Sequence, residues 1–419
     1  MTGGTIAQQI LADKAGIDGM PDPGTHVTVE PDWILCHDIS AHAGRQRMHQ
    51  LGFEEVETPE KVIMAFDHYV PSPNERTTDQ MNVLAEWADE QGITHFFDAG
   101  TGISHNIMAE RGYSVPGALI LGADSHTVTH GAYGAFATGI GHTDLGEVLG
   151  TGALWLRVPK TQRVEVEGTL SDGVGAKDLA LALMGEFSAK GAIYDAIEFH
   201  GPGIRELDMH ERQTLANITV EMGAMAGIVS PDDRTKAHVD GRSVRSFKPV
   251  HPDPDADYAT VRRVSADEIE PLVAKPSAVD NIDTVKNVEG VEVDQVFVGT
   301  CNNSSYADIE VFTNFLEGHD VADGTDLIVV PGTRETLMRL NERGLSNTII
   351  EAGGMIGTPG CGPCFGAHGG ILGDGDVCVG TMNRNFPGRM GAGEIYLAGP
   401  RTAAACAVHG TITDPRRRA

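Results

Sequence analysis

The sequence predicts an α/β protein built from three α/β/α units. Short apolar runs alternate with helical patterns along the chain, 52 of its 419 residues are glycine, and only 5% are aromatic. Glycine suits the many tight turns that join strands to helices in this class of fold. A chain of this length can also bury several hydrophobic cores. We therefore expect units at residues 1–157, 158–285 and 286–419.

The first unit is expected to hold a helix over residues 74–91 and a buried strand over residues 118–127. In the helix, Met81, Leu84 and Ala88 fall on one face, as a period of about 3.6 residues requires. The run ALILGADSHT is apolar at its start and polar at its end. This pattern indicates a strand that leads into a polar turn.

The second unit is expected to begin near RVEVEGTL, at residues 163–170, and to continue with a helix around residues 178–190. Residues 230–286 then become polar and rich in proline and aspartate, as in VHPDPDADY. Such a composition is typical of a boundary or a long connection.

The third unit reads as a repeated succession of strand, turn and helix. A helix is predicted between Thr333, a plausible N-cap, and Gly344, its stop. Ligands of parallel α/β sheets bind beyond the carboxyl ends of the strands. Three cysteines and an arginine cluster fall at such ends, which predicts one shared site. The expected strands lie in VDQVFVGT (293–300), TDLIVVPG (325–332), NTIIEAGG (347–354) and the start of DVCVGTMNRNFPGR (376–389).

The composition excludes several classes of protein. A net charge of −28 repels nucleic acid and anionic membranes, so neither is an expected partner. No run approaches 18 uninterrupted apolar residues, and the N-terminus lacks the features of a secretory signal. Six cysteines in a chain of this size do not form a secreted disulfide framework. We expect a protein of the reducing cytoplasm.

Three cysteines without an obvious fourth are the most informative feature. Cys301 stands in TCNNSSYADI, and Cys361 and Cys364 stand in PGCGPCFGAHGG. A cubane iron–sulfur cluster that only carries electrons takes four thiolates, so three would leave one iron open to act as a Lewis acid. The alternative is a structural zinc site with His368 as fourth ligand. The other cysteines, Cys36, Cys378 and Cys406, read as small buried hydrophobes.

Histidines beside carboxylates are the second group of candidates. FDHYVP pairs Asp67 with His68, GADSHT contains Asp124, Ser125 and His126, and TGISH adds His105. Imidazoles oriented by carboxylates serve general acid–base catalysis, although any single histidine is more often structural. Adjacent residues on an extended segment point to opposite sides, so Asp67 need not touch His68.

Two further groups complete the candidates. In NRNFPGR, Arg384 and Arg389, with Asn383, could clamp a carboxylate, the alternative being ordinary surface salt bridges. Asn217 and Glu221 lie four residues apart and would share one face of a helix. A solvated helix face is the alternative for this pair.

Together these motifs resemble the aconitase superfamily, and within it the large subunits of 3-isopropylmalate dehydratase and homoaconitase. The resemblance runs from TIAQQILADKAG to ITDP, nearly the whole chain, and it rests on five ordered blocks: GADSHTVTHGAYGAFATGIG, GTCNNSS, GCGPCFGAHGG, NRNFPGR and ITDP. It implies three α/β/α units around a 4Fe–4S cluster on Cys301, Cys361 and Cys364, with one open iron.

The resemblance also implies roles for the other candidates. Asp67 and His68 fall where the family protonates the leaving hydroxyl, and His105, Asp124, His126 and Glu221 fall on further catalytic positions. The implied substrate-side residues are His37, Ser125, Asn217, Asn383, Arg384 and Arg389.

The implied activity is that of a hydro-lyase acting on a small hydroxy di- or tricarboxylate. The first expectation is isomerisation of 3-isopropylmalate and 2-isopropylmalate in leucine biosynthesis, and the alternatives are homoaconitate hydratase, aconitate hydratase or another substituted-malate dehydratase. The segment Cys301–Ser305 reads CNNSS where isopropylmalate dehydratases usually read CTNGR, which bears on the distal group of the substrate. The swivelling domain of single-chain aconitases is absent from the sequence, so a separate small subunit is expected to carry it.

Overall fold

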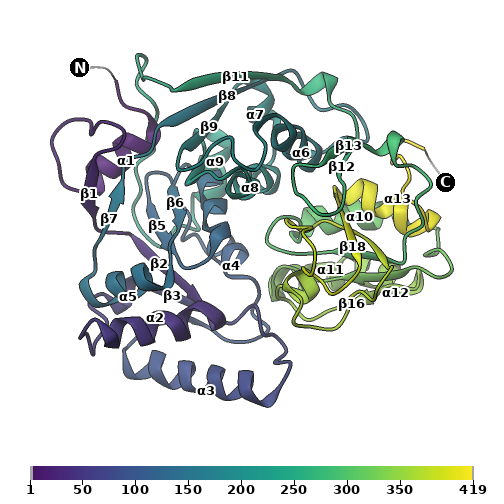
Figure 1. Ribbon diagram of the computed structural model, residues 1–419, viewed down its shortest axis with the longest axis horizontal. Coiled ribbons are helices and arrows are strands. Elements are labelled where there is room, and N and C mark those ends of the chain that lie inside the picture. The colour runs from purple at the N-terminus through teal and green to yellow at the C-terminus, as the bar shows by residue number, and fades with distance from the viewer. Residues whose placement is uncertain (1–2, 418–419) are drawn as a thin grey trace.

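Three sheets of four or more strands follow one another along the chain, with helices packed around them (Figure 1). A fourth, two-stranded antiparallel sheet pairs β1 (His26–Val29) with β7 (Leu154–Arg157). The computed structural model describes residues 3–417, so the outermost ends of the first and third predicted units, residues 1–2 and 418–419, lie outside the described residues. The α/β fold class predicted from the sequence is confirmed. Within residues 3–417, no helix has both the length and the apolar character that crossing a bilayer requires.

The first sheet has five parallel strands in the order β4-β3-β2-β5-β6. The helix predicted at 74–91 is confirmed as α3, which is capped by Asn74 and buries Met81, Leu84 and Ala88. The strand predicted at 118–127 is shorter, because Asp124 caps a long 3₁₀ segment, η2. The elements are α1 (Ile6–Lys14), β1 (His26–Val29), β2 (Trp33–His37), α2 (Asp38–Gln50), β3 (Val62–Ala65), α3 (Glu75–Glu90), β4 (His95–Phe97), α4 (Ser104–Glu110), β5 (Leu119–Gly122), η2 (Ser125–Tyr133), β6 (Phe136–Gly139), α5 (His142–Thr151) and β7 (Leu154–Arg157).

The second sheet has four parallel strands in the order β10-β9-β8-β11. Its edge strand β11 comes from the polar stretch at 230–286, which also contributes α9 and two strands of the next sheet. The boundary at 285 stays a prediction. The elements are β8 (Thr161–Glu167), α6 (Ala176–Phe187), β9 (Ala196–His200), α7 (Pro202–Glu206), α8 (Met209–Ile218), η3 (Thr219–Met222), β10 (Ala226–Val229), α9 (Asp233–Val239) and β11 (Thr260–Ser265).

The third sheet has seven strands in the order β13-β12-β18-β17-β14-β15-β16. Its five strands from β18 to β16 are parallel, while β12 and β13 add an antiparallel edge. In Figure 1 this green-to-yellow region lies beside the purple-to-teal first sheet. The elements are β12 (Leu272–Ala274), β13 (Ile282–Thr284), β14 (Gln295–Val298), α10 (Tyr306–Leu316), β15 (Asp326–Val329), α11 (Arg334–Glu342), α12 (Leu345–Glu351), β16 (Met355–Ile356), η6 (Gly362–Phe365), β17 (Val377–Gly380), β18 (Glu394–Ala398) and α13 (Pro400–His409).

One predicted strand is wrong. Residues 347–354 form most of the helix α12, and the strand that follows, β16, begins only at Met355. Gly344, with φ of 76°, ends α11 and turns the chain directly into α12. Ile349 is then buried in the third core while Ile350 is 58% exposed, so packing of one helix face overrides the strand preference of two β-branched residues. Thr333 does cap α11, as predicted.

Candidate active site

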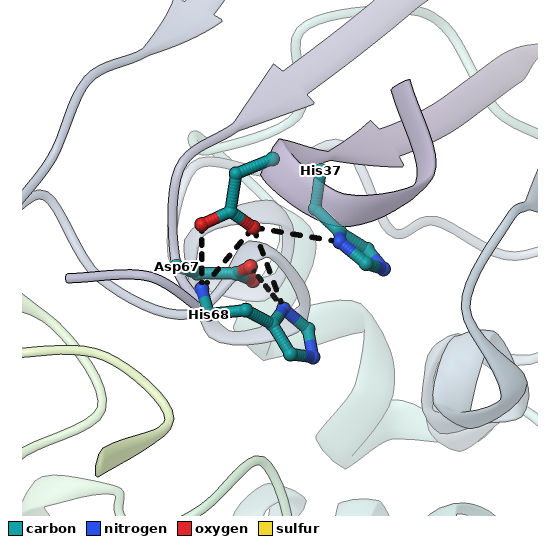
Figure 2. Close-up of side chains that lie close together, drawn as sticks. His37, Asp67 and His68 are labelled. Carbon is teal, nitrogen blue, oxygen red and sulfur yellow. Dashed lines mark hydrogen bonds and ion pairs between the residues drawn. The ribbon is translucent and has the colours of Figure 1, made fainter. Parts of the chain in front are cut away.

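The first part of the site lies where β2 and β3 end. His68 Nδ1 lies 2.6 Å from Asp67 Oδ1, and the other oxygen of Asp67 accepts the Ser104 N–H at 2.8 Å (Figure 2). The contact that the extended-chain argument left open therefore exists. The chain bends after β3, where the Asp38 carboxylate accepts the N–H groups of His68 and Tyr69 at 3.1 and 2.6 Å.

His37, the last residue of β2, packs beside the Asp67–His68 pair. Its ring stacks on that of His68, with centroids 4.2 Å apart and an interplanar angle of 24°. Its two nitrogens lie 3.5 Å from Asp38 and from Asp124. Burial alone would lower the pKa of His37, but these carboxylates outweigh it and raise the pKa to about 10.

Asp67 is the buried anion of the same group. Burial raises the pKa of a carboxyl group, yet the neighbouring His68 and His37 more than compensate and lower the pKa of Asp67 to about 2. In the part of the chain that the structure describes, His37, Asp38, Asp67 and His68 are the one group of possible metal ligands with all ligand atoms within 4.8 Å. Their hydrogen bonds to one another and to backbone N–H groups hold the imidazoles in fixed orientations.

Asp124 joins the predicted histidines into one network. It follows β5, and its Oδ1 lies 2.9 Å from His105 Nε2 and accepts the His126 N–H at 2.6 Å. Although burial opposes ionisation, His105 and His37 hold the pKa of Asp124 well below its usual value. The other ring nitrogen of His105, Nδ1, lies 3.3 Å from Nε2 of His130.

A second chain of contacts leads from His126 to an arginine of the third unit. His126 Nε2 lies 3.2 Å from Glu221 Oε1, and Arg384 Nε donates to the same oxygen at 2.7 Å. Burial raises the pKa of Glu221, but His126 and Arg384 bring it below its usual value. Burial lowers the pKa of His126, so a neutral imidazole faces an ionised carboxylate. Arg384 also donates to Ser125 Oγ at 2.9 Å.

The three predicted cysteines lie against this network. Cys361 donates its N–H to the main-chain oxygen of Asp67 at 2.9 Å, which joins the cysteine turn of the third unit to the first unit. Asn217 and Asn383 each donate an amide N–H to Cys301 Sγ, at 3.2 and 3.3 Å. The positions of the three cysteines at strand ends predicted that they share one site. These contacts agree with that prediction.

The chemistry of these thiols suits an iron–sulfur cluster. Burial raises the pKa of Cys301 to about 12 and that of Cys361 well above its usual value, so both need a bound metal's charge to ionise. Their sulfurs and that of Cys364 do not all lie within 4.8 Å of one another, a wider spacing than one tetrahedral zinc ion needs. His368, the fourth ligand of the zinc alternative, instead bonds the main-chain oxygen of His68.

Unpaired polar atoms border the same space. Asn383 Oδ1 and Arg389 Nε are buried, and neither has a hydrogen-bond partner among the described residues. Arg389 does extend one terminal nitrogen to within 3.6 Å of Cys364 Sγ. Buried polar atoms are normally hydrogen-bonded, so these two atoms are left for a partner that the chain itself does not supply. The other three cysteines, Cys36, Cys378 and Cys406, are fully buried, as predicted.

All fifteen site residues predicted from the sequence therefore lie in one connected set of contacts. Sequence reasoning missed several residues of this set, namely Asp38, His130, Thr129, Asn302 and Lys177. Asp38 could have been found from its place beside His37 in LCHDIS. Lys177 gave no signal, because a lysine near the start of a helix ordinarily indicates a solvated position.

Parallel sheets whose strand ends bring together paired imidazoles and carboxylates, with three thiols of which Cys361 and Cys364 are buried, are the arrangement expected of an α/β hydro-lyase that binds a cluster. The chain belongs to the aconitase family: the family model described as Aconitase family (aconitate hydratase) matches residues 8–410. With this family membership comes a 4Fe–4S cofactor, which confirms the cofactor expected from the sequence.

Known proteins similar to this chain agree with that assignment. It is 46% identical to the 3-isopropylmalate dehydratase large subunit 1 of Methanopyrus kandleri, over 99% of both chains. It is also 46% identical to the probable methanogen homoaconitase large subunit of Methanosarcina mazei, over 92% of this chain and 98% of that one. Among solved structures, the holo-form of Thermococcus kodakaraensis aconitase X shares the fold, with a TM-score of 0.51, 12% identity, and coverage of 90% of this chain and 88% of that chain.

Proposed function

We propose that this chain is the cluster-bearing large subunit of a dehydratase that interconverts 3-isopropylmalate and 2-isopropylmalate by removing and re-adding water. The observation that carries the proposal is the hydrogen bond from Cys361 N–H to the main-chain oxygen of Asp67. It brings the cysteine turn against the Asp67–His68 pair, so metal-binding thiols and an acid–base pair face the same space. Dehydration of a hydroxy acid needs both.

Cys301, Cys361 and Cys364 would hold the 4Fe–4S cluster. When bound, the cluster supplies a Lewis-acidic iron that polarises the hydroxyl group to be removed. Asn217 and Asn383 contribute two N–H···S hydrogen bonds to one of these ligands. Such contacts orient a ligand and tune the electronic properties of what it binds.

His68 would carry the proton that leaves with the hydroxyl as water. Asp67 orients the imidazole through Nδ1, which leaves Nε2 to face the substrate. Asp124 Oδ2 lies 3.9 Å from that nitrogen and adds negative charge beside the ring. His37, stacked on the same ring, keeps solvent from one of its faces.

Arg384 and Arg389 would bind the carboxylates of the substrate. Both come from the segment after β17, and both lie beside cluster-side groups, Glu221 for the first and Cys364 for the second. A guanidinium is the side chain best suited to hold a carboxylate through two hydrogen bonds. The local positive charge also offsets the chain's net charge of −28 toward an anionic substrate.

A separate small subunit would complete the site. The relatives from M. kandleri and M. mazei are both named large subunits, and this chain covers 99% and 98% of their lengths. We propose that the partner carries the swivelling domain with the group that removes the carbon-bound proton. It follows that the purified chain alone holds the cluster but turns over little or no substrate.

Homoaconitate is the second candidate substrate, because the M. mazei relative with that name is as similar as the isopropylmalate relative. In the CNNSS segment, three side chains are used in contacts within the chain. Ser305 Oγ bonds Asp308 at 2.6 Å and caps α10, while the Asn302 and Asn303 side chains contact residues of α8.

The test is anaerobic purification of the chain together with its partner subunit, followed by parallel assays with 3-isopropylmalate, homocitrate and citrate at the absorbance of the enoate product. We expect brown protein with iron and sulfide and turnover of 3-isopropylmalate. Turnover of homocitrate alone would assign the second candidate. Colourless protein that binds zinc would overturn the cluster assignment itself.

A further inference from the structure

Lys177 is a buried lysine whose ammonium group donates all three of its protons in hydrogen bonds. It lies in the first turn of α6, in the second unit, and its side chain reaches into the third unit with only 1% of the residue exposed. Its Nζ donates to Asn302 Oδ1 at 2.6 Å, to the Met382 carbonyl at 2.9 Å and to the Thr381 carbonyl at 3.3 Å. An ammonium group has three protons, and three acceptors receive them.

These contacts fix the orientation of two side-chain amides in succession. A lysine can only donate, so Asn302 must present its oxygen to Lys177 and its nitrogen to the other side. There Asn302 Nδ2 donates to Asn217 Oδ1 at 2.9 Å and to the Thr214 carbonyl at 3.3 Å. Asn217 is thereby turned so that its own nitrogen faces Cys301 Sγ, 3.2 Å away.

The far end of the chain of contacts agrees with this orientation. Asn217 Nδ2 also donates to Thr129 Oγ1 at 2.7 Å. Thr129 uses its hydroxyl proton on the main-chain oxygen of His126 at 2.6 Å, so its oxygen must accept from Asn217. The direction of each hydrogen bond from Lys177 to Cys301 is therefore determined from both ends.

Lys177 also supports the second N–H donor to the same sulfur. Asn383 follows directly after Met382, whose carbonyl Lys177 holds, and Asn383 Nδ2 donates to Cys301 Sγ at 3.3 Å. A single buried ammonium group thus governs both amide donors to Cys301. Arg384, the next residue, lies on the same supported turn.

We propose that Lys177 is a positioning residue that sets both N–H···S hydrogen bonds received by Cys301, one through Asn302 and Asn217 and the other through the turn before Asn383. This inference deepens the proposed function and rests on it, because it assumes that Cys301 is a cluster ligand. Hydrogen bonds to a ligand sulfur and a nearby positive charge both favour the more negative, reduced state of a cluster. The cluster's potential is thus the property that Lys177 controls.

The test compares Lys177→Met and Asn302→Asp with the parent two-subunit enzyme, each with its cluster reconstituted. The readouts are the cluster's midpoint potential, its electron paramagnetic resonance spectrum after reduction, and the rate of iron loss to a chelator. Lys190→Met is the matched control, because Lys190 is exposed just beyond α6 and the same charge is removed without touching the relay. We expect both site variants to lower the potential, alter the spectrum and lose iron about tenfold faster, with the control unchanged.

Asn302→Asp decides the matter if Lys177→Met does not fold. A carboxylate of the same size keeps its contact with Lys177 but has no proton for Asn217, whose amide must turn its oxygen toward Cys301. An unchanged potential and spectrum in Asn302→Asp would overturn the proposal, as would a shift in Lys177→Met alone. A parent enzyme without iron and sulfide would instead refute the proposed function.

Discussion

At the scale of single residues, the surroundings shift the pKa of the same side-chain type in opposite directions. Asp124 and Asp38 raise the pKa of His37 against the effect of its burial, whereas burial, with Arg384 nearby, lowers the pKa of His126. The pKa values of Asp67 and Asp124 are both lowered although burial opposes this, because each carboxylate contacts imidazoles. Sites that separate proton donors from proton acceptors in this way are suited to acid–base chemistry at neutral pH.

Replacement of Asp67 by asparagine tests the acid–base pair. The amide oxygen of Asp67→Asn can still accept the Ser104 N–H, but the negative charge beside His68 is lost. We expect kcat of the two-subunit enzyme to fall about 10²- to 10⁴-fold with little change in KM. Steady-state kinetics at matched cluster content measures this, and Asp98→Asn, at an exposed position, serves as control. An unaltered kcat would remove Asp67 from the mechanism.

The raised pKa of His37 makes a prediction about stability and pH. Its pKa is about 10 in the folded chain against an ordinary 6.5, so its stabilising contribution is complete below the ordinary value and is lost as the pH rises toward 10. We expect His37→Asn to destabilise the metal-free chain most at about pH 6 and least at about pH 10. Denaturant unfolding across this range tests it. A difference at His37 that does not change with pH would contradict the assignment.

At the scale of elements, helix α8 positions part of the site and is itself held by an ion pair whose arginine is fully buried. Arg212, fully buried on α8, binds both oxygens of Asp232 at 2.8 and 2.6 Å. The same carboxylate accepts the Thr235 N–H and so caps α9. Since α8 also carries Asn217, this pair fixes the register of a helix that reaches Cys301.

Removal of the Asp232 carboxylate should therefore be costly. Asp232→Ala leaves a buried guanidinium without its partner and α9 without its cap, and we expect the free energy of unfolding to drop by about 3–5 kcal/mol. Thermal and denaturant unfolding of the metal-free chain measure the loss. Asp233→Ala, one residue further and exposed, should change stability by less than about 0.5 kcal/mol. Equal losses of unfolding free energy in the two variants would show that the Arg212–Asp232 pair stabilises the fold no more than an exposed carboxylate does.

The sequence predicted elements whose own residues determine them and missed those decided by distant packing. The helix α3 was predictable because its cap and apolar face are local. The helix α12 was not, because its burial depends on the third core rather than on its two β-branched residues. Likewise, strand ends and motifs pointed to the predicted candidates, whereas Lys177 reaches the site through Asn302, 125 positions away, and through the turn before Asn383.

At the scale of the whole molecule, the chain combines several clusters of buried apolar residues with a large excess of negative charge. One of these clusters joins residues of the first sheet to Ala196, Ala226 and Ile228 of the second. The net charge of −28, in contrast, acts over the entire surface. Like charges in a compact state repel one another, and dissolved salt screens that repulsion.

Salt should accordingly stabilise this protein. We expect the melting temperature of the metal-free chain to rise as potassium chloride is increased from about 0.02 to about 0.5 M, because the Debye length shrinks across this range. Differential scanning calorimetry measures the trend, and an equal osmolality of a neutral sugar separates screening from solvent exclusion. A melting temperature that falls with added salt would mean that attractive ion pairs outweigh the general repulsion.

The contact between the first and third units also determines when the cofactor can enter. His368 bonds the main chain of His68, 300 positions earlier, and the adjacent turn carries Cys361 and Cys364. A ribosome adds about 5–20 residues per second, so the first sheet can fold before these two cysteines have been synthesised. We therefore expect the cofactor to be loaded after the first sheet has folded, because Cys361 and Cys364 follow that sheet in the sequence.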